Sequence, residues 1–155
     1  MSRTTLETAL RGVRRISLDT TIFLSQASAA DPRQACAQWV IDQVHAGRFE
    51  CVISAVTVAE LLVRPSATDL VQALAAQTAL RQFPHLRVQD FTLDLAADAA
   101  HVRAVTRLKL SHAIVLATAL ANRMEAIVHA DDEWDSKAGP YASTIKLVNL
   151  DHHCR

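Results

Sequence analysis

The segment from Arg15 to Leu24 constrains the fold of this 155-residue chain most strongly. It begins as a short apolar run that ends at Leu18, reaches Asp19, and continues through Thr20 into a new apolar pattern. We interpret this segment as a buried strand, an acid at the carboxyl end of that strand, and the start of a helix. Because ligands gather at the carboxyl ends of strands in open α/β sheets, the segment predicts a functional crevice at Asp19.

Four further short apolar runs are predicted to be strands, at residues 50–54, 86–91, 125–130 and 145–150. Segments with helical periodicity separate these runs, and we expect two consecutive helices between residues 55 and 83, the first of which Pro65 would end. This alternation predicts a three-layer α/β domain with a mainly parallel central sheet of about four to five strands. We expect the domain to cover residues 14–150, after an N-terminal arm of residues 1–13 and before a polar tail of residues 151–155.

Composition narrows the classes of function. Half of the residues are hydrophobic, which argues against global disorder, and an aromatic content of 5% argues against a base-stacking platform. The 16 basic and 16 acidic side chains balance, so overall charge does not point to nucleic acid. No apolar run approaches the roughly 20 residues of a membrane span. Three widely spaced cysteines, Cys36, Cys51 and Cys154, are expected to be free thiols in a reducing cytoplasm.

Two further acidic positions are predicted to converge on the crevice at Asp19. Helical geometry turns Glu60 toward the carboxyl end of the strand at residues 50–54, and Asp131 follows the strand at residues 125–130. Close carboxylates repel one another unless a cation lies between them. Oxygen ligands suit Mg²⁺ or Mn²⁺, which polarises a phosphate and activates a water molecule for phosphodiester hydrolysis.

The ordered motifs of the chain resemble those of the PIN domain, and especially those of VapC-type toxin ribonucleases. The resemblance covers about residues 14–150 and is carried by the motifs at residues 17–22, 53–61, 110–119 and 128–131. The Ser-x-x-Thr-x-x-Glu-Leu pattern from Ser54 to Leu61 is the most specific of these motifs. The resemblance implies a Rossmann-like sheet, a Mg²⁺- or Mn²⁺-dependent endoribonuclease, frequent homodimers, and a cognate antitoxin as partner.

Carried over by residue, Asp19, Glu60 and Asp131 match the catalytic and metal-binding acids of the family. Thr20 or Ser54 could support these acids through hydrogen bonds. The resemblance also implies a protein that acts on RNA, and the cysteine content favours a cytoplasmic location.

One departure from the family pattern bears on activity. The family usually has Asp at the start of the buried helix, where this chain has His112. Replacement of the carboxylate by imidazole removes one negative charge and one hard oxygen ligand. An imidazole nitrogen binds softer ions better than it binds Mg²⁺. Three outcomes are open: the site has lost its activity while the fold is kept, Asp132 or Asp135 completes the metal site, or His112 is itself a ligand and shifts the metal preference.

Four basic residues are candidates for contact with the RNA backbone: Arg15, Arg103, Arg107 and Lys109. Basic residues near a helix C-terminus also interact favourably with the helix dipole, so their presence has a second explanation. Two functions therefore follow from the sequence: a metal-dependent endoribonuclease, or a PIN-like module that has lost its chemistry and binds RNA or protein.

Overall fold

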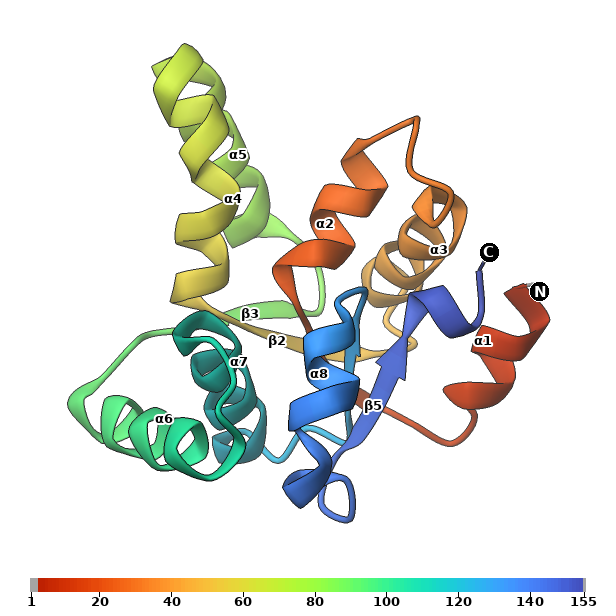
Figure 1. Ribbon diagram of the computed structural model, residues 1–155. Coiled ribbons are helices and arrows are strands. Elements are labelled where there is room, and N and C mark those ends of the chain that lie inside the picture. Colours follow the sequence, from red (N-terminus) through yellow and green to blue (C-terminus); the bar gives the residue numbers. More distant parts are fainter. Residues whose placement is uncertain (1–2, 155) are drawn as a thin grey trace.

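The structure, a computed structural model, describes residues 3–154 and contains a five-stranded sheet with helices on both faces (Figure 1). The strands are β1 (Arg15–Leu18), β2 (Glu50–Ser54), β3 (Leu86–Gln89), β4 (Ala126–His129) and β5 (Lys146–Asn149). Their order is β3-β2-β1-β4-β5, and each neighbouring pair is parallel. The predicted α/β class is confirmed, with β1 at the centre of the sheet.

Alternating side chains of the strands enter two separate hydrophobic clusters. Ile16 and Leu18 face the first cluster, with α1 (Arg3–Ala9), α2 (Thr20–Ala27) and α3 (Gln34–His45). The intervening strand positions, such as Val52 and Ile127, face the second cluster, with α6 (Leu93–Thr106), α7 (Leu110–Ala121) and α8 (Asp132–Lys137). Because helices cover both faces, β1, β2 and β4 are buried along most of their length, whereas the edge strand β3 alternates apolar with polar residues and is only partly buried.

The helix α7 is apolar on nearly every side and is buried from His112 to Ala119. It packs against α6 and against the strands β1, β2 and β4. A helix with this composition belongs in the interior of a domain, as its sequence predicts. Its first turn reaches the carboxyl edge of the sheet, which is how a histidine enters the crevice there.

The helices α4 (Ala55–Thr68) and α5 (Leu70–Gln82) form a hairpin that projects away from the sheet (Figure 1). The prediction that Pro65 ends the first of them is wrong, because α4 continues past Pro65 to Thr68. The chain instead breaks at Asp69, whose extended backbone ends α4 and whose side chain accepts hydrogen bonds from the Val71 and Gln72 backbone N–H groups at the start of α5. The cap of the second helix, rather than the proline of the first, sets this boundary.

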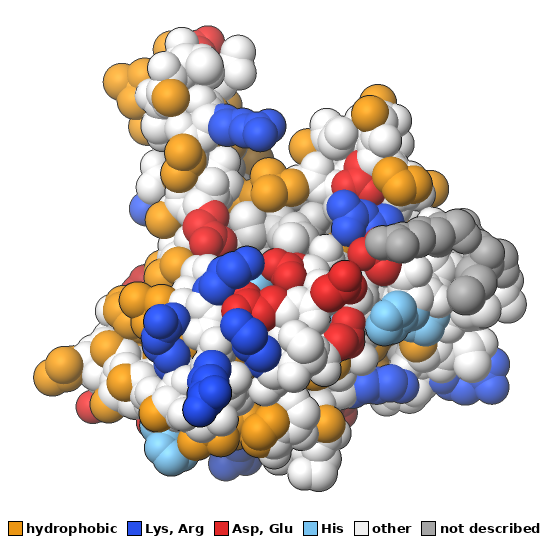
Figure 2. Space-filling view, viewed as in Figure 1, with side chains coloured by type: hydrophobic (Ala, Val, Ile, Leu, Met, Phe, Trp, Pro, Cys, Tyr) orange, Lys and Arg blue, Asp and Glu red, His pale blue; other side chains and the backbone are white. Residues whose placement is uncertain are grey.

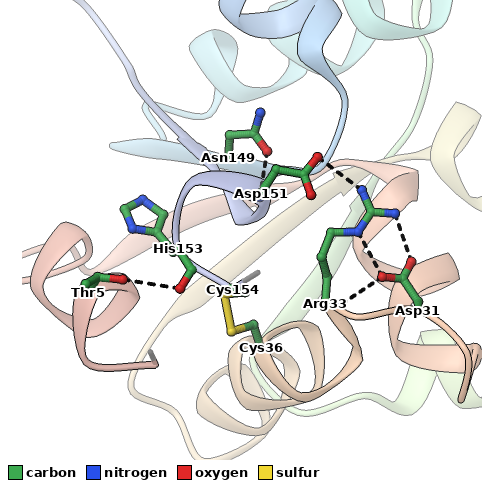
Figure 3. Close-up of a disulfide and its surroundings, with 8 residues drawn as sticks. All are labelled: Thr5, Asp31, Arg33, Cys36, Asn149, Asp151, His153 and Cys154. Atoms are coloured by element: carbon green, nitrogen blue, oxygen red, sulfur yellow. Dashed lines mark hydrogen bonds and ion pairs between the residues drawn. A yellow bond between two sulfur atoms is a disulfide. The ribbon is translucent and has the colours of Figure 1, made fainter. Parts of the chain in front are cut away.

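The prediction of three free thiols is also wrong, because Cys36 and Cys154 form a disulfide (Figure 3). Cys36 lies on α3, and Cys154 follows the last short helix, η2 (Leu150–His152), which comes after β5 and the earlier η1 (Gly139–Tyr141). The pairing joins positions separated by 118 residues, so only the fold brings the two sulfur atoms together. Cys51 is free and buried on β2.

An arginine connects the same region to the crevice. Arg33, which precedes α3, forms ion pairs with Asp31 and Asp151 (Figure 3). It also donates a hydrogen bond of 3.1 Å to the carbonyl oxygen of Ala130, the residue before Asp131. The disulfide and the Arg33 contacts therefore fix the C-terminal segment and the end of β4 against α3.

In residues 3–154 there is no single helix with the length and apolar character needed to cross a membrane. The successive helices α6 and α7 pass such a test only when taken together, with a bend of 116° between them.

Candidate metal centre

Two of the three predicted acids meet at the carboxyl edge of the sheet because β1 and β4 are adjacent. Asp19 follows β1 and caps α2: its Oδ2 accepts hydrogen bonds from the Thr21 backbone N–H at 3.3 Å and from the Thr21 hydroxyl at 2.7 Å. Asp131 follows β4 and caps α8, accepting the Glu133 backbone N–H at 2.9 Å. Each acid lies where a parallel strand gives way to a helix, as the sequence predicts.

The third acid, Glu60, reaches the same edge from the second turn of α4. Its Oε2 accepts a hydrogen bond from the hydroxyl of Thr20, the first residue of α2. Ser54 ends β2 and caps α4, where its hydroxyl accepts the Val56 backbone N–H at 3.1 Å. Thr20 therefore supports Glu60 directly, while Ser54 sets the direction of the helix that carries Glu60.

His112 stands between the acids, in the position where the resemblance expects a carboxylate. Its Nε2 lies 3.7 Å from Asp19 Oδ1 and 3.7 Å from Asp131 Oδ2. Its side chain is only 8% exposed. The imidazole thus lies close to two of the predicted acids.

Glu133, which the sequence analysis did not single out, completes the cluster. Its Oε2 lies 2.8 Å from His112 Nδ1, and its Oε1 accepts hydrogen bonds from the Lys109 backbone N–H and the Lys137 ammonium group. Burial alone would raise the pKa of Glu133, but the hydrogen bond from Lys137 and the neighbouring positive groups lower it overall. The Asp-x-Glu spacing of Asp131 and Glu133 is the signal in the sequence that indicates this contact. An N-cap residue such as Asp131 places the residue two positions later, Glu133, in the first helical turn.

Lys109 contacts these acids at the rim of the crevice. Its Nζ lies 3.5 Å from Asp131 Oδ2 and 3.6 Å from Glu133 Oε2, while its side chain is 64% exposed. The charges of Asp131 and then Glu133 raise the pKa of Lys109. For Asp131, burial would raise the pKa, but the Glu133 backbone N–H and the nearby positive groups lower it overall.

Asp132 and Asp135 point away from this cluster. Asn149 on β5 donates to Asp132 Oδ1 at 3.4 Å and to Asp135 Oδ2 at 2.5 Å. Within residues 3–154, His112, Asp131 and Glu133 form the group whose potential ligand atoms all lie within 4.8 Å of one another. The structure therefore does not bring Asp132 or Asp135 to the position that His112 occupies.

The basic candidates divide between the two edges of the sheet. Arg103 and Arg107 are exposed near the α6–α7 connection that leads to Lys109, and Arg103 also donates to the Leu108 carbonyl at 2.9 Å. Figure 2 shows Lys and Arg side chains gathered beside the acidic group. Arg15 begins β1, so about 13 Å of strand separates it from Asp19. It lies at the opposite edge and is not part of the cluster.

A groove of about 740 Å³ runs from the acids between α2 and the α4–α5 hairpin. One end is lined by Asp19, Glu60 and His112, and the rest is mainly apolar, with Leu24 and Val63 among its walls. The polar end is therefore accessible to a ligand that enters along the groove.

The donor set at this end fits a divalent cation. The carboxylates of Asp19 and Asp131 flank His112 Nε2 at 3.7 Å each, distances too long for hydrogen bonds. A cation in such a gap offsets the repulsion among the carboxylates. Because one donor is an imidazole nitrogen, the set also differs from the all-oxygen environment that Mg²⁺ prefers.

The sequence pattern of the PIN domain family matches residues 16–140 of this chain. Comparison with curated proteins gives no match. Similar folds occur in a toxin–antitoxin complex from Klebsiella pneumoniae, with 22% identity, a TM-score of 0.63, and coverage of 87% of this chain and 97% of the other.

Two further solved structures show the same likeness. FitAcB from Neisseria gonorrhoeae has 20% identity and a TM-score of 0.63, with 88% of this chain and 99% of the other covered. VapC20 from Mycobacterium tuberculosis, described as a toxin that cleaves the sarcin-ricin loop, has 20% identity and a TM-score of 0.62, with 80% and 95% covered. At these identities the likeness establishes a common fold.

Proposed function

Because this chain belongs to the PIN domain family, we propose that it is a metal-dependent endoribonuclease and the toxin of a toxin–antitoxin pair. The observation that carries the proposal is that Asp19 and Glu60 line one accessible crevice at the carboxyl edge of the sheet together with His112, whose Nε2 also lies 3.7 Å from Asp131 Oδ2. This is the edge where open α/β sheets bind their ligands.

In this proposal Asp19, Glu60 and Asp131 hold Mg²⁺ or Mn²⁺. A bound divalent cation polarises a phosphate oxygen and lowers the pKa of water, which favours hydrolysis of a phosphodiester. The chain supplies the orientation: two donors from Thr21 fix one oxygen of Asp19, and the hydroxyl of Thr20 fixes Glu60. Preorganised ligands of this kind keep the acids in place despite their mutual repulsion.

The RNA would approach over the α6–α7 connection. Lys109 lies at the rim of the crevice, and Arg107 and Arg103 extend the positive surface away from it. These groups would contact phosphates, which makes RNA binding dependent on salt. An RNA contact at Arg15 would be separate from the cleavage site, since that residue lies at the other edge of the sheet.

Protein partners are part of the same proposal. Two of the similar structures are described as a toxin–antitoxin complex and as a toxin, which supports an antitoxin as partner. The α4–α5 hairpin exposes large apolar side chains, with Val63, Leu70 and Val71 each at least 64% exposed, and such patches mark protein interfaces. We expect a homodimer that also binds an antitoxin, which light scattering of the chain alone and with its partner would test.

A cytoplasmic location is proposed because the substrate is RNA. Disulfides are rare in a reducing cytoplasm, so the Cys36–Cys154 bond makes this part of the proposal testable. Alkylation of free thiols in intact cells before lysis should find these two cysteines reduced if the protein works in the cytoplasm. Protection of both from alkylation would contradict a reducing location.

The second candidate function is a PIN-like module that binds RNA or protein without cleaving RNA. The observation in its favour is His112 itself, because a protonated imidazole between Asp19 and Asp131 would offset their charge without any metal. In that case the fold and the groove would be kept for binding alone.

Cleavage of a structured RNA by the purified chain, with Mg²⁺ and then Mn²⁺, tests both functions. We expect cleavage by the native chain, its loss in Asp19→Asn, and its retention in Asp98→Asn, a matched change on the exposed face of α6. Cleavage that is equal in the native chain and Asp19→Asn would refute the proposed site. An inactive native chain that becomes active in His112→Asp would establish the binding module instead.

A further inference from the structure

The orientation of the His112 ring is fixed from two sides. Glu133 Oε2 lies 2.8 Å from Nδ1, and the Trp134 ring packs against the imidazole with 4.9 Å between ring centroids. Trp134 is itself fully buried. The imidazole therefore has little freedom to rotate, and the direction of its second nitrogen is set by the fold.

The partner of Nδ1 is anchored as well. Glu133 accepts the Lys109 backbone N–H at 3.2 Å and the Lys137 ammonium group at 2.6 Å through its other oxygen. An ionised carboxylate only accepts hydrogen bonds, so the proton of a neutral His112 lies on Nδ1. The lone pair is then on Nε2, which faces the acids.

The position of Nε2 matches that of a metal ligand. Its distances of 3.7 Å to Asp19 Oδ1 and 3.7 Å to Asp131 Oδ2 exceed the range of hydrogen bonds. Two donors that each lie about 2.1 Å from one cation are about 3.0–3.6 Å apart, so a shift of a few tenths of an ångström would bring His112 Nε2 and either carboxylate oxygen to the separation of two ligands of one ion. A metal-binding histidine almost always donates its other N–H to a carboxylate or carbonyl, as His112 does to Glu133.

We propose that His112 binds the metal through Nε2, that Glu133 orients it, and that this centre therefore selects Mn²⁺ or another transition-metal ion over Mg²⁺. The existence of a metal centre rests on the proposed function, and the nitrogen ligand and the ion preference go beyond it. Imidazole suits Mn²⁺, Co²⁺ and Zn²⁺ better than Mg²⁺, which keeps oxygen ligands and water. Glu133 is a positioning residue here, because it acts through His112.

Electron spin echo measurements on the full chain with one equivalent of Mn²⁺ detect a directly bound imidazole nitrogen. We expect a ¹⁴N modulation in the native chain and in His101→Gln, which alters an exposed histidine on α6. The modulation should be absent in His112→Asp and His112→Gln. Circular dichroism and thermal melting would show that each variant is folded, and the spectrum of the native chain decides the question even if one variant is not.

Calorimetric titrations with Mn²⁺ and Mg²⁺ measure the selectivity. The ratio of Mn²⁺ to Mg²⁺ affinity should fall at least tenfold in His112→Asp, because a carboxylate replaces the nitrogen donor. Glu133→Gln should weaken Mn²⁺ binding by about 10- to 100-fold, the usual effect of losing a group that orients a metal ligand. A native chain that binds Mn²⁺ with no ¹⁴N modulation, or that binds both ions equally, would overturn the inference.

The RNA cleavage assay separates this inference from the proposed function. Nitrogen-bound Mn²⁺ in a chain that cleaves no RNA would uphold the metal ligand and refute the nuclease. Cleavage with Mg²⁺ that depends on Asp19, without nitrogen coordination of Mn²⁺, would uphold the nuclease and refute the role of His112. Failure to bind any divalent ion would also refute that role and would leave the imidazole as the counter-charge of the acids.

Discussion

Removal of the Cys36–Cys154 disulfide should lower the free energy of unfolding by several kcal/mol. The bond closes a segment of 118 residues, and the loss of chain entropy in the unfolded state is worth about 4.7 kcal/mol for a loop near this length. We expect a decrease of about 3–5 kcal/mol, because residual structure in the unfolded chain reduces the entropic effect. This is a large part of the roughly 5–15 kcal/mol by which domains are stable.

Urea denaturation followed by circular dichroism, with and without dithiothreitol, measures this effect. The native chain should unfold at lower urea concentration when it is reduced, and with a larger m value, because the unfolded chain then exposes more surface. The variant Cys36→Ser/Cys154→Ser should match the reduced native chain and should not respond to the reductant. Burial raises the pKa of the Cys51 thiol, so this third cysteine stays protonated in the folded chain and does not exchange with the bond there.

Identical unfolding curves for the oxidised and reduced native chain would refute this reasoning. Such a result would mean either that the bond does not form or that the unfolded chain gains no freedom when it is broken. Mass spectrometry of the alkylated protein distinguishes these two cases by counting the free thiols.

Three further predictions concern other parts of the molecule. Arg33 holds the pKa of Asp31 well below its usual value, so Asp31→Asn should lower stability by about 1–2 kcal/mol at pH 6 by urea denaturation. That difference should be complete above the unfolded pKa near 3.9 and should shrink as pH falls below it; a difference that grows in acid would contradict this. Trp134→Ala should lower the melting temperature strongly, since loss of a fully buried aromatic costs about 3–5 kcal/mol, whereas an unchanged melting curve would show that the ring is not packed. Lys109→Gln should tighten Mn²⁺ binding a few fold in calorimetry at low salt, because a competing charge leaves Asp131; weaker binding would contradict this.

Much of the fold could be predicted because parallel strands buried on both faces give short, continuous apolar runs. All five runs are strands, and the acids at the ends of the first and fourth lie together because β1 and β4 are neighbours. Glu60 could be placed as well, since helical geometry alone turns it toward the end of the preceding strand.

Other features depend on the tertiary structure and were not accessible in the same way. Cys36 and Cys154 are 118 residues apart, and nothing in their local sequence indicates that α3 and the C-terminal segment are in contact. Pro65 is a strong helix breaker in isolation, yet in the projecting hairpin the cap at Asp69 decides where α4 ends. At this point the capping interactions of α5 outweigh the low helix propensity of Pro65.

The candidate site shows the same division. The sequence identified His112 as a departure from the family pattern, but it could not show that the imidazole lies between Asp19 and Asp131. It also placed Asp132 and Asp135 as possible substitutes, because consecutive acids look equivalent in a sequence. On α8 they diverge: Asp131 caps the helix toward the crevice, whereas Asp135 faces Asn149.

Diffraction from crystals grown with Mn²⁺, with anomalous data collected above the manganese absorption edge, tests the central claim most directly. The account predicts one anomalous peak between Asp19 and Asp131, within bonding distance of both carboxylates and of His112 Nε2. A crevice without such a peak at saturating Mn²⁺, with the imidazole still between the two acids, would contradict the metal centre and the function built on it.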